Sequence, residues 1–160
     1  MTDTIIMFIH LVAAGVAVGS SAFGLILLWP RIFNPQKDES LDENSVPYKV
    51  IDLLAPTVFT CLLLLIGSGV YYMMENYTEQ VNLKEGYYNI LGFKLIFVVV
   101  AFFLSLYQTF GLRSKIAHLD LRPENREWVR PTLEKMKYFG GLTLGAIVFA
   151  LFMGVYLTRY

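Results

Sequence analysis

The stretch that decides the fold is residues 5–29, IIMFIHLVAAGVAVGSSAFGLILLW, in which His10 is the one ionisable side chain. It exceeds the ~20 residues that a helix needs to cross a hydrocarbon core. The apolar residues do not alternate with polar ones, and lipid requires internal pairing of every backbone polar group, so a helix is favoured over a barrel strand. The run is too long for a signal-peptide core and no basic region precedes it, so we expect it in the mature protein.

Three further apolar runs of similar length follow, at residues 51–73, 90–112 and 138–157. Charged residues make up 16% of the chain and apolar residues 56%, whereas a soluble domain usually has about a quarter charged residues. We therefore predict an all-α fold, an integral membrane four-helix bundle that forms one membrane domain over residues 1–160. The composition excludes a disordered chain and a nucleic-acid binder, and the single cysteine, Cys61, excludes a disulfide scaffold.

The basic residues predict how the bundle is oriented. The connections at residues 30–50 and 113–137 carry ten lysines and arginines, whereas the other side has Lys84 and Arg159, with Lys94 just inside the third run. Cytoplasmic connections of membrane proteins are enriched in Lys and Arg. We therefore expect both of these connections in the cytoplasm, and both termini on the outer side of a bacterial plasma membrane.

Ionisable side chains inside a membrane span are candidates for function, because burying them in lipid is costly. His10 is five residues into the first run, which at ~1.5 Å per residue places it ~8 Å below the outer boundary. Lys94 is four residues into the third run and so lies at a similar depth. Asp52, at the start of the second run, is expected to favour a helix N-terminus electrostatically.

The outer ends of the runs also hold thioethers, which together with imidazole suit soft metal ions such as Cu(I). Met7 is three residues before His10 and shares its helix face, and three more thioethers, those of Met73, Met74 and Met153, fall at the same level. The candidate metal ligands are His10, Met7, Met73 and Met153.

Small residues are concentrated in the first run, where Gly15 and Gly19 are four residues apart. Such a face either lets helix backbones approach closely or leaves room for a flat cofactor. The residues alone do not choose between these two interpretations.

The order of the segments resembles the small four-helix membrane proteins grouped around the HemJ-type protoporphyrinogen oxidases and the CopD copper-resistance membrane domain. The similar pieces are FIHLVAAGVAVGSSAFGLILLWPRIF at residues 8–33, YKVIDLLAPTVF at 48–59 with GSGVYY at 67–72, and GFKLIFVVVAFFLSLYQTFGLRSK at 92–115. The resemblance implies a helix bundle in which His10 and Lys94 are the characteristic polar positions. The activity that it implies is membrane oxidation of protoporphyrinogen, with b-type haem bound.

Three functions remain as hypotheses. The first is an oxidoreductase-like haem b or porphyrin site near the outer leaflet, with His10 as axial ligand, Gly15 and Gly19 as a flat slot, Lys94 as the candidate catalytic residue, and Lys94 or Arg159 facing the propionates. The second is copper handling, and the third is a scaffold subunit without a cofactor. The expected partner is the lipid bilayer, a homo-oligomer or a larger membrane complex stays open, and no nucleic acid is expected.

Overall fold

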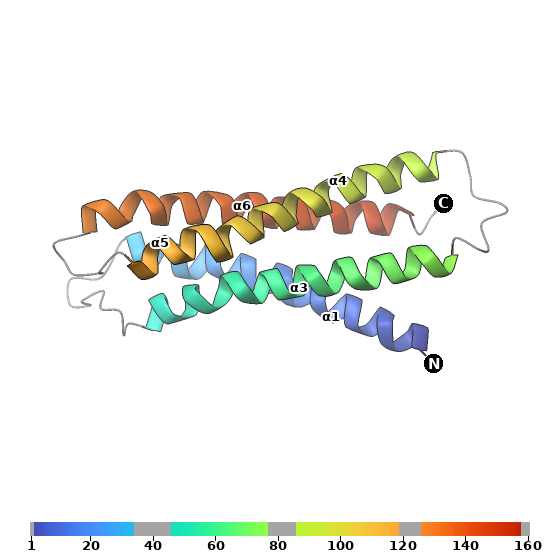
Figure 1. Ribbon diagram of the computed structural model, residues 1–160, viewed down its shortest axis with the longest axis horizontal. Coiled ribbons are helices and arrows are strands. Elements are labelled where there is room, and N and C mark those ends of the chain that lie inside the picture. Colours follow the sequence, from blue (N-terminus) through green and yellow to red (C-terminus); the bar gives the residue numbers. More distant parts are fainter. Residues whose placement is uncertain (1, 34–45, 77–85, 119–125, 158–160) are drawn as a thin grey trace.

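The computed structural model describes residues 2–33, 46–76, 86–118 and 126–157, and within these ranges the chain contains no strand. Four helical rods run side by side (Figure 1). The first comprises α1 (Thr2–Phe23), the π-helical segment η1 (Gly24–Leu28) and α2 (Trp29–Phe33); the second is α3 (Val46–Asn76). The third comprises α4 (Tyr87–Leu106), η2 (Tyr107–Leu112, also π-helical) and α5 (Arg113–His118); the fourth is α6 (Arg126–Leu157).

All four rods are long and apolar enough to cross a membrane, over Thr2–Phe33, Lys49–Glu75, Tyr87–Lys115 and Glu127–Leu157. The predicted all-α four-helix bundle is thereby confirmed. Each rod continues beyond the apolar run that predicted it, most of all at α6, which begins twelve residues before Tyr138, at Arg126. Proline does not end α6, although Pro131 lies inside it.

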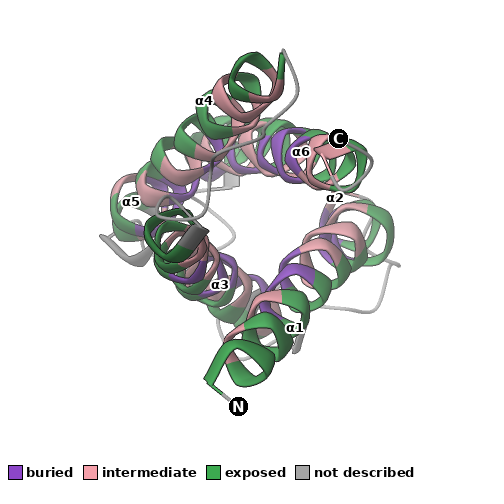
Figure 2. Ribbon diagram, turned by 90° about the vertical axis from the view of Figure 1, so that its right-hand side faces the viewer, coloured by how far each residue is buried: buried purple, intermediate pink, exposed green. Residues whose placement is uncertain are grey.

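The rods form a four-sided bundle in the order α1, α3, α4, α6 (Figure 2). The most extensive contacts join α1 to α3 and α4 to α6. The start of α1 and the end of α6 lie at the same end of the bundle, which we call the N/C end (Figure 1). The opposite end, where α2, α5 and the start of α6 meet, we call the basic end, because Arg31, Arg113, Lys115, Arg130, Lys135 and Lys137 belong to those segments.

Small side chains form the centre of the bundle. Ala17 and Ala101 are fully buried, and all four rods contribute to one apolar cluster comprising Ala13, Ala17, Val58, Cys61, Leu62, Ala101, Ala146 and Ile147. Small residues allow helix backbones to approach closely in lipid, where packing rather than water exclusion holds helices together. A second cluster at the basic end is built from larger side chains: Leu28, Trp29, Ile32, Ile51, Leu112 and Met136.

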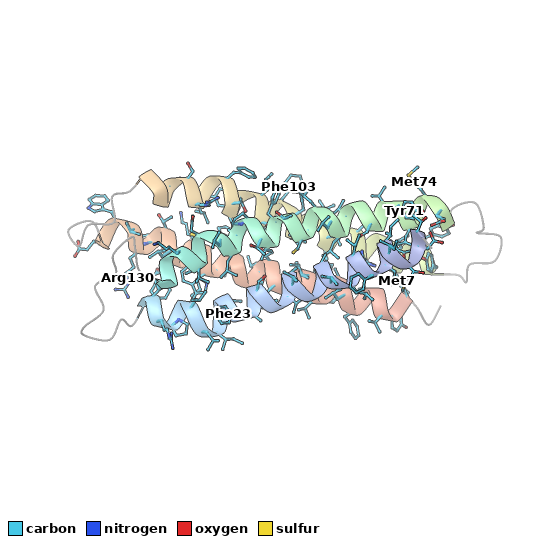
Figure 3. The ribbon with its side chains drawn as sticks, turned by 90° about the horizontal axis from the view of Figure 1, so that it is seen from below. Met7, Phe23, Tyr71, Met74, Phe103 and Arg130 are labelled. Carbon is cyan, nitrogen blue, oxygen red and sulfur yellow. The ribbon has the colours of Figure 1, made fainter. Side chains whose placement is uncertain are left out.

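The outward faces of the rods are apolar and exposed. Large side chains such as Phe8, Ile26, Phe103 and Phe152 have more than half of their surface open. Phe23 and Phe103 point away from the bundle (Figure 3). An exposed apolar surface of this extent on every rod suits a lipid environment.

Candidate functional site

His10 on α1 points into the bundle toward α3. Its Nδ1 lies 2.6 Å from the Oγ of Ser68, which is buried. The Ser68 hydroxyl has one proton and donates it to the carbonyl oxygen of Leu64, at 2.6 Å. In the tautomer in which Ser68 keeps this bond to Leu64, its Oγ accepts from His10 and Nδ1 carries the imidazole proton. The hydrogen bond of His10 within the described residues involves Nδ1 alone, and in this tautomer Nε2 presents a lone pair to a ligand.

Lys94 on α4 brings an ammonium group to the same part of the bundle. Its side chain is half-buried and reaches α6, where Nζ lies 3.2 Å from the position that a Cβ on Gly154 would occupy. The absence of a side chain at Gly154 leaves room for the ammonium. His10, Ser68, Lys94 and Gly154 all lie in the half of their rods that is nearer the N/C end (Figure 1). All four rods thus contribute to this region, which we call the histidine site: His10, Ser68, Lys94 and Gly154.

A tether between α1 and α3 closes the N/C end beside the histidine site. The Tyr72 hydroxyl donates to the backbone carbonyl of Asp3 at 2.8 Å, and the Tyr71 hydroxyl donates to the Asp3 carboxylate at 3.4 Å. Figure 3 shows Tyr71 and Met7 at this end. The two phenols therefore fix the start of α1, and with it the rotation of the helix that carries His10.

The predicted thioether ligands differ in how far they are buried. Met7 is 57% exposed and Met73 is 41% exposed, so both have large parts of their side chains on the outside of the bundle, while Met153 is half-buried. No group of three or more His, Cys, Asp or Glu side chains suited to a metal ion occurs in the part of the chain that the structure describes. The ligand roles of His10, Met7, Met73 and Met153 stay predictions.

Gly15 and Gly19 lie on the exposed side of α1, and a Cβ at either position would have no atom within 4 Å. Neither glycine therefore allows close packing inside this bundle. Arg159, the other proposed partner of a propionate, lies outside the described residues.

A second polar region lies on α4 and η2 and was not predicted from the sequence. Ser105 is 1% exposed and Gln108 is 8% exposed, and Thr109 and Thr143 are also buried. Ser105 Oγ, Gln108 Nε2 and Thr109 Oγ1 have no hydrogen-bond partner among the described residues. The Gln108 amide nitrogen faces α6, 3.8 Å from the position of a Cβ on Gly140. We call Ser105, Gln108 and Thr109 the η2 polar layer.

The π-helical geometry of η2 offers a reason for the unpaired hydroxyl of Thr109. Elsewhere in the bundle Thr57, Thr60, Ser68 and Thr143 each donate to the carbonyl four residues earlier. In a π-helix the wider turn moves that carbonyl, and such segments are frequent at functional sites. The one sequence signal for this layer is Gln108, the single amide side chain in the run at residues 90–112.

Asp52 has a different role from the one expected at a helix start. Because α3 begins at Val46, Asp52 lies beyond the first turn, and its carboxylate instead pairs with Arg113 of α5. The guanidinium donates twice, from Nε to Oδ1 at 2.6 Å and from Nη2 to Oδ2 at 3.0 Å. This two-bond contact joins the second and third rods at the basic end.

Comparisons of the chain with protein-family models, with curated proteins and with solved structures found no match.

Proposed function

We propose that this multi-pass membrane protein binds a haem b or related porphyrin at the histidine site and takes part in redox chemistry there. The observation that supports the proposal best is the state of His10. In the tautomer with the proton on Nδ1, Ser68 accepts that N–H and the Nε2 lone pair is unused by the described residues. Histidines that ligate metals almost always donate the other ring N–H to such a partner, which fixes the tautomer and the ring orientation.

The chemistry of the donor set fits a haem with one protein ligand better than it fits copper. A single proximal imidazole is sufficient for haem in several protein classes, whereas a Cu(I) site needs several soft ligands around one point. Met7 and Met73 are largely exposed, which weakens a thioether site at His10. When bound, the haem would supply reversible one-electron chemistry.

Lys94 would serve this site through its charge. Its ammonium lies beside Gly154, in the same half of the bundle as His10, so a carboxylate of a tetrapyrrole near His10 would have a cation to pair with. We propose Lys94 as the residue that orients such a ligand. Gly15 and Gly19 face away from the bundle, which favours a contact with a neighbouring helix over a cofactor slot inside it.

We further propose that the basic end faces the cytoplasm of a bacterial cell and the N/C end faces outward. The charges of α2, α5 and the start of α6 support this orientation, because Lys and Arg are enriched on the cytoplasmic side. The histidine site would then lie in the outer half of the bilayer. Membership of the HemJ-type and CopD group, with protoporphyrinogen-type oxidation as the activity, is part of the same proposal.

An optical spectrum of the full chain, purified after expression with a haem supply, tests the proposal. We expect a Soret band that His10→Ala abolishes and that His118→Ala, on α5 at the other end of the bundle, leaves unchanged. Ser68→Ala should retain the band but bind the pigment about tenfold more weakly, as is typical of a lost outer-shell partner. A wild-type chain without pigment but with bound copper would favour copper handling. A chain with neither, recovered only in a large assembly that His10→Gln leaves intact, would favour a scaffold.

A further inference from the structure

A groove of about 590 Å³ lies between the first rod and α6, near the basic end of the bundle. It is separate from both polar regions described above. Its walls come from η1, α2 and α6, and its lining residues are Leu25, Phe33, Arg130, Glu134, Lys137, Tyr138, Gly141 and Leu142. Figure 3 shows Arg130 toward the end of the bundle opposite Met7.

The α6 wall is one continuous stripe. Its lining positions 130, 134, 137, 138, 141 and 142 are separated by the three- and four-residue steps that keep side chains on one helix face. The charged members come first, toward the start of α6, and the apolar members follow. The groove is therefore charged toward the basic end and apolar toward the middle of the span.

Two cations and one carboxylate lie at the charged end. Arg130 Nε is 3.4 Å from Glu134 Oε1, and both side chains are well exposed, so this pair contributes little to stability. The Lys137 ammonium is 5.3 Å from the centre of the Phe33 ring, a cation–π contact that holds it over the groove. An anion that entered here would meet a net positive charge with unused donors.

The apolar end is open because of Gly141. A Cβ at this position would have no atom within 4 Å, and Leu25 and Leu142 line the same space. An extended hydrocarbon chain fits such a surface, whereas a second charged group does not. The charged end suits a polar headgroup and the apolar end suits a hydrocarbon chain, so the groove matches an amphiphile that lies parallel to the helices.

We propose that this groove binds an anionic phospholipid, with its phosphate between Arg130 and Lys137 and an acyl chain over Leu25, Gly141 and Leu142. Basic pockets between membrane helices on the cytoplasmic side are suited to acidic lipid headgroups. The proposal rests on the orientation proposed above, with the basic end in the cytoplasm, but not on the histidine site or on any cofactor there.

Binding of dioleoylphosphatidylglycerol to the full chain in neutral detergent, followed by native mass spectrometry, tests the charged end. Replacement of both cations, by Arg130→Gln with Lys137→Gln, should weaken binding about 30-fold, as expected for the loss of two basic groups near a lipid phosphate. Glu134→Gln should strengthen binding, because it removes the carboxylate that competes for Arg130. Lys135→Gln is the matched control: it removes an exposed cation of α6 that does not line the groove, and it should have no effect.

Gly141→Leu tests the apolar end without removing a charge. The new side chain should fill the groove and reduce binding at least tenfold, while Gly67→Leu, at an exposed α3 glycine with equal free space, should leave binding unchanged. Leu is a better helix former than Gly, so both variants should fold. The proposal would be overturned if phosphatidylcholine bound as tightly as phosphatidylglycerol, or if Lys135→Gln weakened binding as much as the double replacement does. Full competition by millimolar inorganic phosphate would also overturn it. So would a Gly141→Leu chain that binds normally or that loses only a contact between two copies of the chain.

Discussion

The histidine site and the η2 polar layer place polar groups inside the same apolar bundle in opposite ways. At the histidine site each described hydrogen bond leads to the next, from His10 to Ser68 and from Ser68 to the Leu64 carbonyl. In the η2 polar layer three buried polar atoms have no partner among the described residues. The first arrangement fixes a side chain in one orientation, whereas the second leaves donors available for a water or a ligand.

Replacing the amide of the η2 polar layer should have the largest effect on stability. Gln108→Met keeps the length and flexibility of the side chain but removes an unpaired buried donor, so we expect the free energy of unfolding to rise by about 2 kcal/mol. Denaturation of the full chain in mixed micelles of SDS and a neutral detergent measures this change.

Gln108→Glu serves as the opposite variant, because a carboxylate at this buried position should lower stability. A loss of stability in Gln108→Met would instead mean that the amide has a partner in the membrane. In that case the contrast between the two polar regions would disappear.

Removal of the Ser68 hydroxyl from the histidine site should change the free energy of unfolding by less than Gln108→Met does. Ser68→Ala leaves the His10 Nδ1–H without its acceptor, and we expect a loss of about 1 kcal/mol, within the range measured for hydrogen bonds between membrane helices. Thr60→Ala is the matched control, since exposed Thr60 donates only to a carbonyl of its own helix. Equal losses in the two variants would show that the bond between α1 and α3 contributes nothing.

The ion pair at the basic end should give the smallest change. Asp52→Asn weakens the two-bond contact with Arg113, but both side chains are about 40% exposed, so we expect a loss of about 0.5 kcal/mol that falls as salt is added. Unfolding at low and high ionic strength measures it. A loss that does not depend on salt would mean that the pair is shielded from solvent, as the η2 polar layer is.

The sequence was sufficient to predict the features that depend on composition. It was not sufficient for the side-chain partners, which depend on contacts between distant segments. Four apolar runs predicted the four-helix bundle, and His10 was recognisable because an imidazole is rare in such a run. The partner of His10 was not predictable, because serine occurs in many membrane helices without a role and the contact joins residues 58 positions apart. Asp52 was misassigned for the same reason, since only the packed bundle brings Arg113 next to it.

The two π-helical segments were also not predictable from the sequence. Where apolar residues occur on all sides of a helix, their pattern does not distinguish a π-helix from an α-helix. Gly24–Leu28 and Tyr107–Leu112 look like ordinary span in composition. The η2 polar layer was missed with them, apart from the hint given by Gln108.

The segment η1 sets how far α1 is rotated about the axis of the first rod relative to α2. Each residue of an α-helix advances the side-chain direction by about 100°, and the wider turn of η1 takes up one extra residue, so rewinding η1 as regular α-helix with all its residues kept would turn α1 relative to α2 by about that angle. With α2 anchored by Trp29 and Ile32 in the basic-end cluster, the imidazole would swing out of the bundle and into the surrounding lipid. One extra residue, placed two-thirds of the way along the rod, thus sets the direction in which a histidine fourteen positions earlier points.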